Sequence, residues 1–136
     1  MAIRLLLLLS LLSMLALQSC SATSARAMLV ADEAMNGKRI TLHRGDELTI
    51  ELPENPSTGY RWQADDDSNG NILEAVGSRF TSDDTGSGAL GVGGTRRFTF
   101  RATGIGSCSL HYTLIPPGRD RSDGQQRYSI DVVVTD

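Results

Sequence analysis

Alternation of polar and apolar residues is the feature that most limits how this chain can fold. It recurs in short segments, at residues 47–52, 95–103, 107–114 and 128–134, and turn residues separate one segment from the next. A period of two is typical of strands that bury one face. After the N-terminal apolar run, no stretch of the chain shows a helical period. About seven short strands of this kind predict an all-β protein, an antiparallel β-sandwich.

The N-terminal residues have a different character. Arg4 precedes an apolar run from Leu5 to Leu17, which is too short to span a bilayer but suits the core of a signal peptide. Leu17-Gln18-Ser19-Cys20 follows it directly and resembles a bacterial lipobox, whose cysteine is lipidated and becomes the first residue of the mature chain. We therefore expect Cys20 to carry a lipid anchor, in an exported protein of the bacterial envelope or periplasm.

These features divide the chain into three parts. Residues 1–19 are expected to be a lipoprotein-type signal peptide, residues 20–34 a tether and N-terminal segment, and residues 35–136 the folded domain. A competing cleavage site is Ala25-Arg26-Ala27, which fits the small-x-small rule for ordinary secretion. The choice between a lipid anchor and ordinary secretion stays open at this point.

Charge and cysteine content exclude some partners. The chain carries 13 basic and 16 acidic residues, a net charge of −3, whereas nucleic-acid binding favours a basic surface. We expect no nucleic-acid partner, and membrane contact only through a lipid at Cys20. Cys108 is the one other cysteine, so no disulfide is expected. It shares a strand face with Leu110 and Tyr112, which predicts a buried free thiol.

A loop with a defined shape is predicted where Asn55-Pro56-Ser57-Thr58-Gly59-Tyr60-Arg61-Trp62 joins two strands. Pro56 fixes its own φ and biases Asn55 toward extended geometry. Gly59 can supply a positive φ. Residues 55–60 carry no charge, and we call them the first loop. Trp62, in the strand that follows, is expected in the core between the sheets.

This stretch resembles the signature loop of the chagasin-like inhibitors of cysteine peptidases. A second match is Leu90-Gly91-Val92-Gly93-Gly94-Thr95 with Phe98-Thr99-Phe100, which resembles the glycine-rich loop of that family and the strand leaving it. Gly104-Ile105-Gly106 and Leu110-His111-Tyr112 are similar to the next turn and strand. The resemblance runs from about Met35 to the C-terminus, in the order and spacing of the family. It implies an immunoglobulin-like sandwich.

The resemblance also implies a function. A chagasin-like protein would be a reversible, non-covalent inhibitor of papain-like cysteine peptidases, not an enzyme, acting as a monomer without cofactor or metal. Three adjacent loops would form a wedge in the active-site cleft: the first loop, the glycine loop (residues 81–94) and the third loop (residues 115–125). Thr58 would approach the catalytic cysteine. The implied contact residues are Asn55, Pro56, Ser57, Thr58, Gly59 and Tyr60 in the first loop, Leu90, Gly91, Val92, Gly93 and Gly94 in the glycine loop, and Ile115, Pro116 and Pro117 in the third loop.

The third loop departs from the family pattern. Relatives carry Arg-Pro and an aromatic residue after the strand tyrosine, whereas this chain has Tyr112-Thr113-Leu114-Ile115-Pro116-Pro117-Gly118. Arginine and large aromatic residues are common hot spots of interfaces. Their absence supports an alternative, a non-inhibitory β-sandwich binding module of the envelope that recognises another protein or a glycan.

Catalysis and metal binding have weak support in the sequence. Cys108 and His111 lie three apart in one strand, so their side chains should leave opposite faces. The segment from Asp65 to Asn71 has oxygen-bearing side chains spaced like the start of a calcium loop, but Val76 stands where the bidentate glutamate belongs. A solvated loop is the preferred interpretation of this segment, and calcium binding is the alternative.

Overall fold

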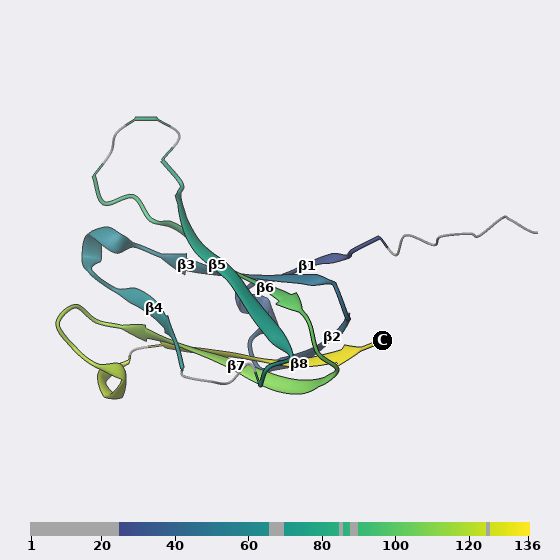
Figure 1. Ribbon diagram of the computed structural model, residues 1–136. Coiled ribbons are helices and arrows are strands. Elements are labelled where there is room, and N and C mark those ends of the chain that lie inside the picture. Colours follow the sequence, from purple (N-terminus) through teal and green to yellow (C-terminus); the bar gives the residue numbers. More distant parts are fainter. Residues whose placement is uncertain (1–24, 66–69, 85, 88–89, 125) are drawn as a thin grey trace, which may run out of the picture.

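The chain forms two four-stranded β-sheets packed face to face (Figure 1). The computed structural model describes residues 25–65, 70–84, 86–87, 90–124 and 126–136. The first sheet has the strand order β1 (Met28–Ala31), β3 (Glu47–Glu54), β6 (Gly94–Ala102) and β5 (Leu73–Ser82). The second has the order β2 (Lys38–His43), β8 (Gln126–Thr135), β7 (Gly106–Ile115) and β4 (Arg61–Ala64). The predicted β-sandwich is confirmed.

The direction of two strands differs from the antiparallel arrangement that the sequence predicts. β1 pairs with β3 in parallel, and β2 pairs with β8 in parallel. The 3-10 turn η1 (Glu33–Met35) carries the chain from β1 in one sheet to β2 in the other. Alternation along a strand shows which face is buried, but it carries no information on the direction of the neighbouring strand.

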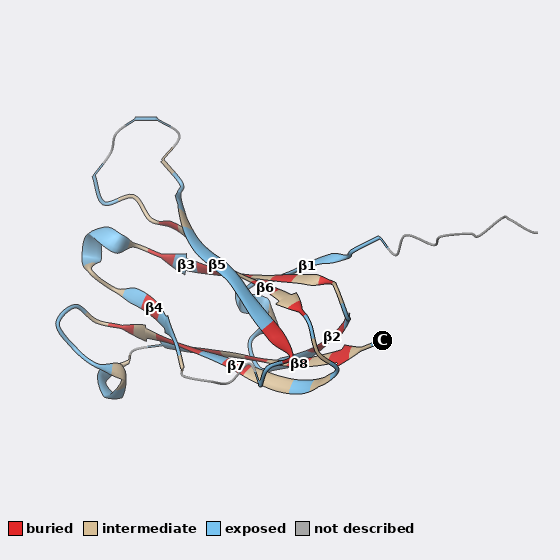
Figure 2. Ribbon diagram, in the orientation of Figure 1, coloured by how far each residue is buried: buried red, intermediate tan, exposed pale blue. Residues whose placement is uncertain are grey.

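The core lies between the sheets and follows the predicted period of two. In β3 every second residue is buried, and in β8 the residues from Tyr128 to Val134 alternate in the same way. Trp62 is buried, as the sequence predicts. Burying one Leu or Ile side chain contributes about 1.5–3 kcal/mol, so these strands supply much of the stability of the domain. Figure 2 shows buried residues at intervals along strands of both sheets.

β5 is the exception to this regular burial. From Glu74 to Arg79 its residues are exposed (Figure 2), and its register against β6 shifts between Ala75 and Gly77. The shift lies beside Gly77, and a glycine inside a strand often marks a bulge. A bulge of this kind bends an edge strand and hinders pairing with another chain.

Cys108 differs from its prediction in degree. It is a free cysteine that packs against the core, but it is half-buried rather than fully buried. Burial raises the pKa of its thiol. His111 is exposed on the other face of β7, so the two side chains do lie on opposite faces of the strand.

Three loops lie at one end of the sandwich, away from the C-terminus (Figure 1). They join β3 to β4, β5 to β6 and β7 to β8, and are the first loop, the glycine loop and the third loop. The strands extend slightly into two of them, since β5 ends at Ser82 and β7 at Ile115. Across the described ranges, no helix is long and apolar enough to cross a membrane. The predicted signal peptide and Cys20 lie outside the described residues.

Candidate functional site

The first loop is a single 3-10 turn, η2 (Pro56–Thr58), with a cap at each end. Asn55 has extended backbone angles, and its Oδ1 accepts hydrogen bonds from the Ser57 N–H at 3.2 Å and the Ser57 hydroxyl at 2.6 Å. Gly59 follows the turn with a φ of 77°, in the left-handed region. Both backbone predictions are confirmed. An asparagine before a proline and a glycine after the turn are the residues these conformations favour.

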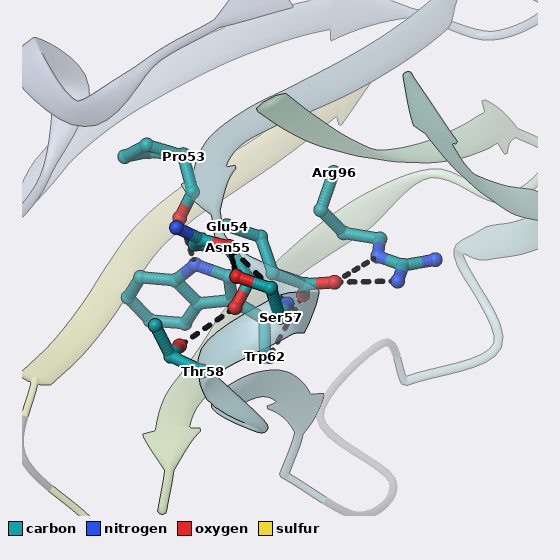
Figure 3. Close-up of polar contacts among 7 residues, drawn as sticks. All are labelled: Pro53, Glu54, Asn55, Ser57, Thr58, Trp62 and Arg96. Atoms are coloured by element: carbon teal, nitrogen blue, oxygen red, sulfur yellow. Dashed lines mark hydrogen bonds and ion pairs between the residues drawn. The ribbon is translucent and has the colours of Figure 1, made fainter. Parts of the chain in front are cut away.

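Thr58 lies on the exposed surface of this turn, and its polar groups point back to the loop. Its hydroxyl donates to the Asn55 carbonyl at 2.7 Å, and its N–H donates to the same oxygen at 3.1 Å. Figure 3 shows these bonds. The loop therefore satisfies its own polar groups and presents an uncharged, preorganised tip, which reduces the entropy lost on binding a partner.

The base of the first loop is held by groups that sequence reasoning missed. The Trp62 indole N–H donates to the Pro53 carbonyl at 2.8 Å, and the Trp62 backbone N–H donates to Glu54 Oε2 at 3.1 Å. Glu54 Oε1 accepts from Nε and Nη2 of Arg96, at 3.1 and 2.5 Å (Figure 3). The available signal was a charged residue at an inward position of β3, where the alternation calls for an apolar one.

The glycine loop adjoins the first loop through its backbone. Asn55 Nδ2 donates to the Gly91 carbonyl at 3.0 Å. Gly91 has a φ of 82°, and a Cβ placed there would lie 3.8 Å from the Ser57 hydroxyl. Leu90 beside it is fully exposed, at 100% of its surface. The structure thus brings the described parts of the two predicted loops together.

The third loop adjoins the first loop from the other side. A Cβ on Gly59 would lie 2.8 Å from Pro117 Cβ, so the proline ring packs directly against the glycine. Pro116 is half-buried and Pro117 exposed. Ile115 is only 1% exposed, which corrects its assignment as a contact residue: it stays buried within β7. A partner can reach the two prolines but not the isoleucine.

A second turn within the third loop covers the outer face of its own sheet. η3 (Arg121–Asp123) is capped by Asp120, which accepts from the N–H of Ser122 at 2.8 Å and from the Ser122 hydroxyl. These bonds hold the pKa of the Asp120 carboxyl below its usual value. Gly124 packs against Thr113, which is buried although its strand position points away from the core.

Hollows lie on both sides of the first loop. One, of about 310 Å³, separates it from the base of the glycine loop and is lined by Pro53, Glu54, Asn55, Asp83, Gly93 and Gly94. The other, of about 440 Å³, separates it from the third loop and is lined by Tyr60, Pro116, Arg119, Ser122, Asp123 and Gly124. The first loop is therefore a ridge between two depressions.

No metal site is found in the part of the chain that the structure describes. Within those ranges, no three His, Cys, Asp or Glu side chains gather in a way that could hold a metal ion. The predicted calcium alternative falls on residues 65–71, and residues 66–69 lie outside the description.

Loops that adjoin at one end of a rigid sandwich are a common place for a protein to contact another macromolecule. The model of the chagasin family of peptidase inhibitors, I42, matches residues 41–132, which is more than half of the chain. The chain belongs to this family. It is thus a member of a family of peptidase inhibitors rather than of enzymes.

Solved structures share this fold. The cysteine protease inhibitor EhICP2 from Entamoeba histolytica superimposes with a TM-score of 0.71 at 18% identity, over 82% of this chain and 98% of its own. Amebosin gives a TM-score of 0.64 at 26% identity, over 80% and 98%. PbICP-C, solved in complex with falcipain-2, gives 0.50 at 19% identity, over 80% and 99%. No curated protein matches the chain.

Proposed function

We propose that this protein is a reversible, non-covalent inhibitor of papain-like cysteine peptidases, with the first loop inserted in the active-site cleft. Family membership and the structural relative complexed with falcipain-2 support the target class. The observation that best supports this mode of inhibition is the ridge formed by the first loop. An uncharged, internally hydrogen-bonded turn between two hollows is complementary in shape to a cleft between two rims. The glycine loop and the third loop would contact those rims.

The chemistry of the loop suits blocking rather than reaction. The Thr58 hydroxyl is engaged as a donor to the Asn55 carbonyl, and no residue of the first loop is a base that could activate it. The 3-10 turn also differs from the extended strand in which peptides pair with a receptor edge, so the loop fills the cleft without offering a peptide bond in that form. Inhibition therefore needs no covalent step.

The alternative is a non-inhibitory binding module that uses the same loops on another protein or a glycan. The observation that favours it is the third loop, which lacks the arginine and aromatic residue of relatives and whose Ile115 is buried. Such a module would retain the ridge but bind no peptidase cleft.

Titration against papain separates the two functions. Papain activity is followed on a fluorogenic peptide with increasing amounts of the protein, and a preformed complex is then diluted to test for recovery. The inhibitor proposal expects stoichiometric loss of activity and full recovery on dilution. Papain activity that stays unchanged at micromolar protein would remove the proposal and leave the binding module.

We also propose that the protein is exported and anchored by a lipid at Cys20. Support comes from the apolar run and the lipobox-like residues that follow it. Mass spectrometry of the protein from the native membrane fraction should find a diacylated cysteine at the N-terminus. A soluble chain that begins at Met28 would indicate ordinary secretion instead.

A further inference from the structure

A group of side chains from four strands lies beneath the first loop and the glycine loop. Glu54 is the last residue of β3, and Trp62 lies in β4, so the two residues flank the first loop. Phe80 and Arg96, in β5 and β6, flank the glycine loop in the same way. The guanidinium carbon of Arg96 lies 5.5 Å from the Phe80 ring centroid while the guanidinium binds Glu54. The group therefore connects the bases of both loops.

The carboxylate of the ion pair in this group is buried, and its guanidinium is partly buried. The Glu54 side chain is 1% exposed and that of Arg96 is 27% exposed. Glu54 continues the inward face of β3, whose earlier members are Leu48, Ile50 and Leu52. Replacing a buried ion pair by apolar residues often leaves stability unchanged or raises it, so stability does not explain a pair at this position. Breaks in a local pattern of this kind are expected at functional sites.

We propose that Glu54 and Arg96 are positioning residues that set the first loop relative to the glycine loop, and so shape the surface offered to a peptidase. This inference rests on the proposed function. Glu54 holds the first loop through the Trp62 N–H, and Arg96 fixes Glu54 to the strand that leaves the glycine loop. Two hydrogen bonds to one carboxylate oxygen, with an aromatic ring beside the guanidinium, restrict rotation more than a single contact does.

The same two strands carry a matched control. Arg97 Nε donates to Glu51 Oε1 at 2.6 Å, one residue further along β6. This pair lies on the outer face, with side chains 37% and 30% exposed. It joins β3 to β6 as the buried pair does, and Arg97 Nη1 also donates to Thr81 Oγ1 in β5 at 2.9 Å, where the glycine loop begins. Among the described residues, no contact joins this pair to Trp62 or to Phe80. It separates the effect of linking the strands from the effect of positioning the loops.

The test compares two double variants of the full protein. Glu54→Gln with Arg96→Met removes both buried charges and keeps an acceptor for the Trp62 N–H. Glu51→Gln with Arg97→Met makes the same change on the outer face. We expect the buried variant to keep its thermal midpoint within a few degrees, to inhibit papain at least about tenfold less, and to dissociate faster. Its Ser57 and Thr58 amides should exchange faster with solvent. The outer variant should inhibit within about twofold of the parent.

Each other outcome decides the matter. Parent-like inhibition and amide exchange in the buried variant would overturn the positioning role. If the thermal midpoint of the buried variant is much lower than that of the parent, Arg96→Lys is tested instead. Lysine keeps the positive charge but lacks the planar guanidinium that donates two hydrogen bonds to Glu54. About fivefold weaker papain inhibition by Arg96→Lys supports the positioning role, and inhibition equal to that of the parent overturns it. If the parent itself does not inhibit papain, the proposed function fails, and amide exchange at Ser57 and Thr58 still tests the positioning separately.

Discussion

The first loop and the third loop contain the same kind of turn, and they differ in the residue that caps it. Asn55 caps η2 through Ser57, and Asp120 caps η3 through Ser122, with a bond to the backbone N–H and one to the hydroxyl in each case. An amide retains an N–H₂ donor after its oxygen has capped the turn, whereas a carboxylate retains only acceptors and a charge. Asn55 uses that donor on the Gly91 carbonyl.

The comparison shows how one turn serves two purposes. With an amide cap the first loop is neutral and bonded to its neighbour, which suits a surface that must enter a partner's cleft. With a carboxylate cap the third loop is charged and folds back over its own sheet, where it covers Thr113. Its link to the first loop is the apolar contact of Pro117 with Gly59. The two loops therefore share the 3-10 turn and differ in the residue that caps it and in the neighbours that this residue contacts.

The largest expected effect is a change at the tip of the first loop. We predict that Thr58→Arg weakens papain inhibition more than about 100-fold, because bulk and charge would clash where the cleft is narrowest. The thermal midpoint should move by only a few degrees, since an exposed loop change rarely costs more than about 0.5 kcal/mol. Inhibition constants and melting curves of the same preparations provide the measurement.

The control for Thr58 is Asp123→Arg, at the corresponding third position of η3. It should weaken inhibition by less than about tenfold, because the third loop is expected at the rim. A Thr58→Arg variant that inhibits as well as the parent would place the loop outside the cleft and give the binding module the lead.

The next effect concerns the contact between the loops. Gly59 and Gly118 both have positive φ, of 77° and 68°. A Cβ at Gly59 would lie 2.8 Å from Pro117 Cβ, whereas one at Gly118 would have no atom within 4 Å beyond its two chain neighbours. Left-handed backbone costs a residue with a Cβ about 1–2 kcal/mol. We predict that Gly59→Val lowers the free energy of unfolding by about 2–3 kcal/mol and weakens inhibition more than about tenfold. Urea denaturation and inhibition assays measure both.

Gly118→Val serves as the control, since it carries the backbone strain without the clash. It should cost about 1–2 kcal/mol and change inhibition by less than about threefold. Equal losses of inhibition in the two variants would mean that the contact of Gly59 with Pro117 does not hold the loops.

A smaller effect is expected when the caps are exchanged. Asn55→Asp keeps the Oδ1 acceptor for Ser57 but replaces the donor to the Gly91 carbonyl with an oxygen. We predict about tenfold weaker inhibition at neutral pH, because two acceptors then face each other. Asp120→Asn keeps its cap and should inhibit within about twofold of the parent. Should Asn55→Asp inhibit like the parent, the bond to Gly91 would have no part in shaping the surface.

The smallest effect is a difference in response to acid. The pKa of Asp120 is lowered chiefly by the Ser122 hydroxyl and then by the Ser122 N–H, so the folded loop favours the ionised form. Its contribution is complete above the ordinary pKa of 3.8 and is lost as pH falls through the lowered value. The NMR shift of the Ser122 amide should change in that range. The Ser57 amide should not follow it, because Asn55 does not titrate, and Asp120→Asn should abolish the change.

The sequence predicts the first loop well because each of its preferences is local. Pro56 restricts Asn55, and Gly59 accepts a positive φ, whatever the rest of the chain does. The base of the loop could not be predicted in this way. Glu54 and Arg96 are 42 residues apart, and their pairing depends on the antiparallel register of β3 with β6.

The third loop shows the same limit from another side. Alternation along β7 predicts that Leu110 and Tyr112 are buried, and it places Thr113 and Ile115 on the outer face. Both are buried in the structure, Thr113 beneath Gly124 of the third loop. A period of two shows which face of a strand packs on the core. It cannot show where a long loop folds back and covers the other face.

The parallel pairing of β2 with β8 affects when the domain can fold. It joins residues near 40 to residues near 132, so the second sheet closes a loop that spans most of the chain. Contacts between distant residues cost chain entropy before they stabilise anything, and β-sandwiches accordingly fold in milliseconds to seconds. This sheet cannot be completed until the ten residues of β8 are available, wherever the domain folds. Until then β2 and β7 have unpaired edges, on which another unfolded chain could add a strand.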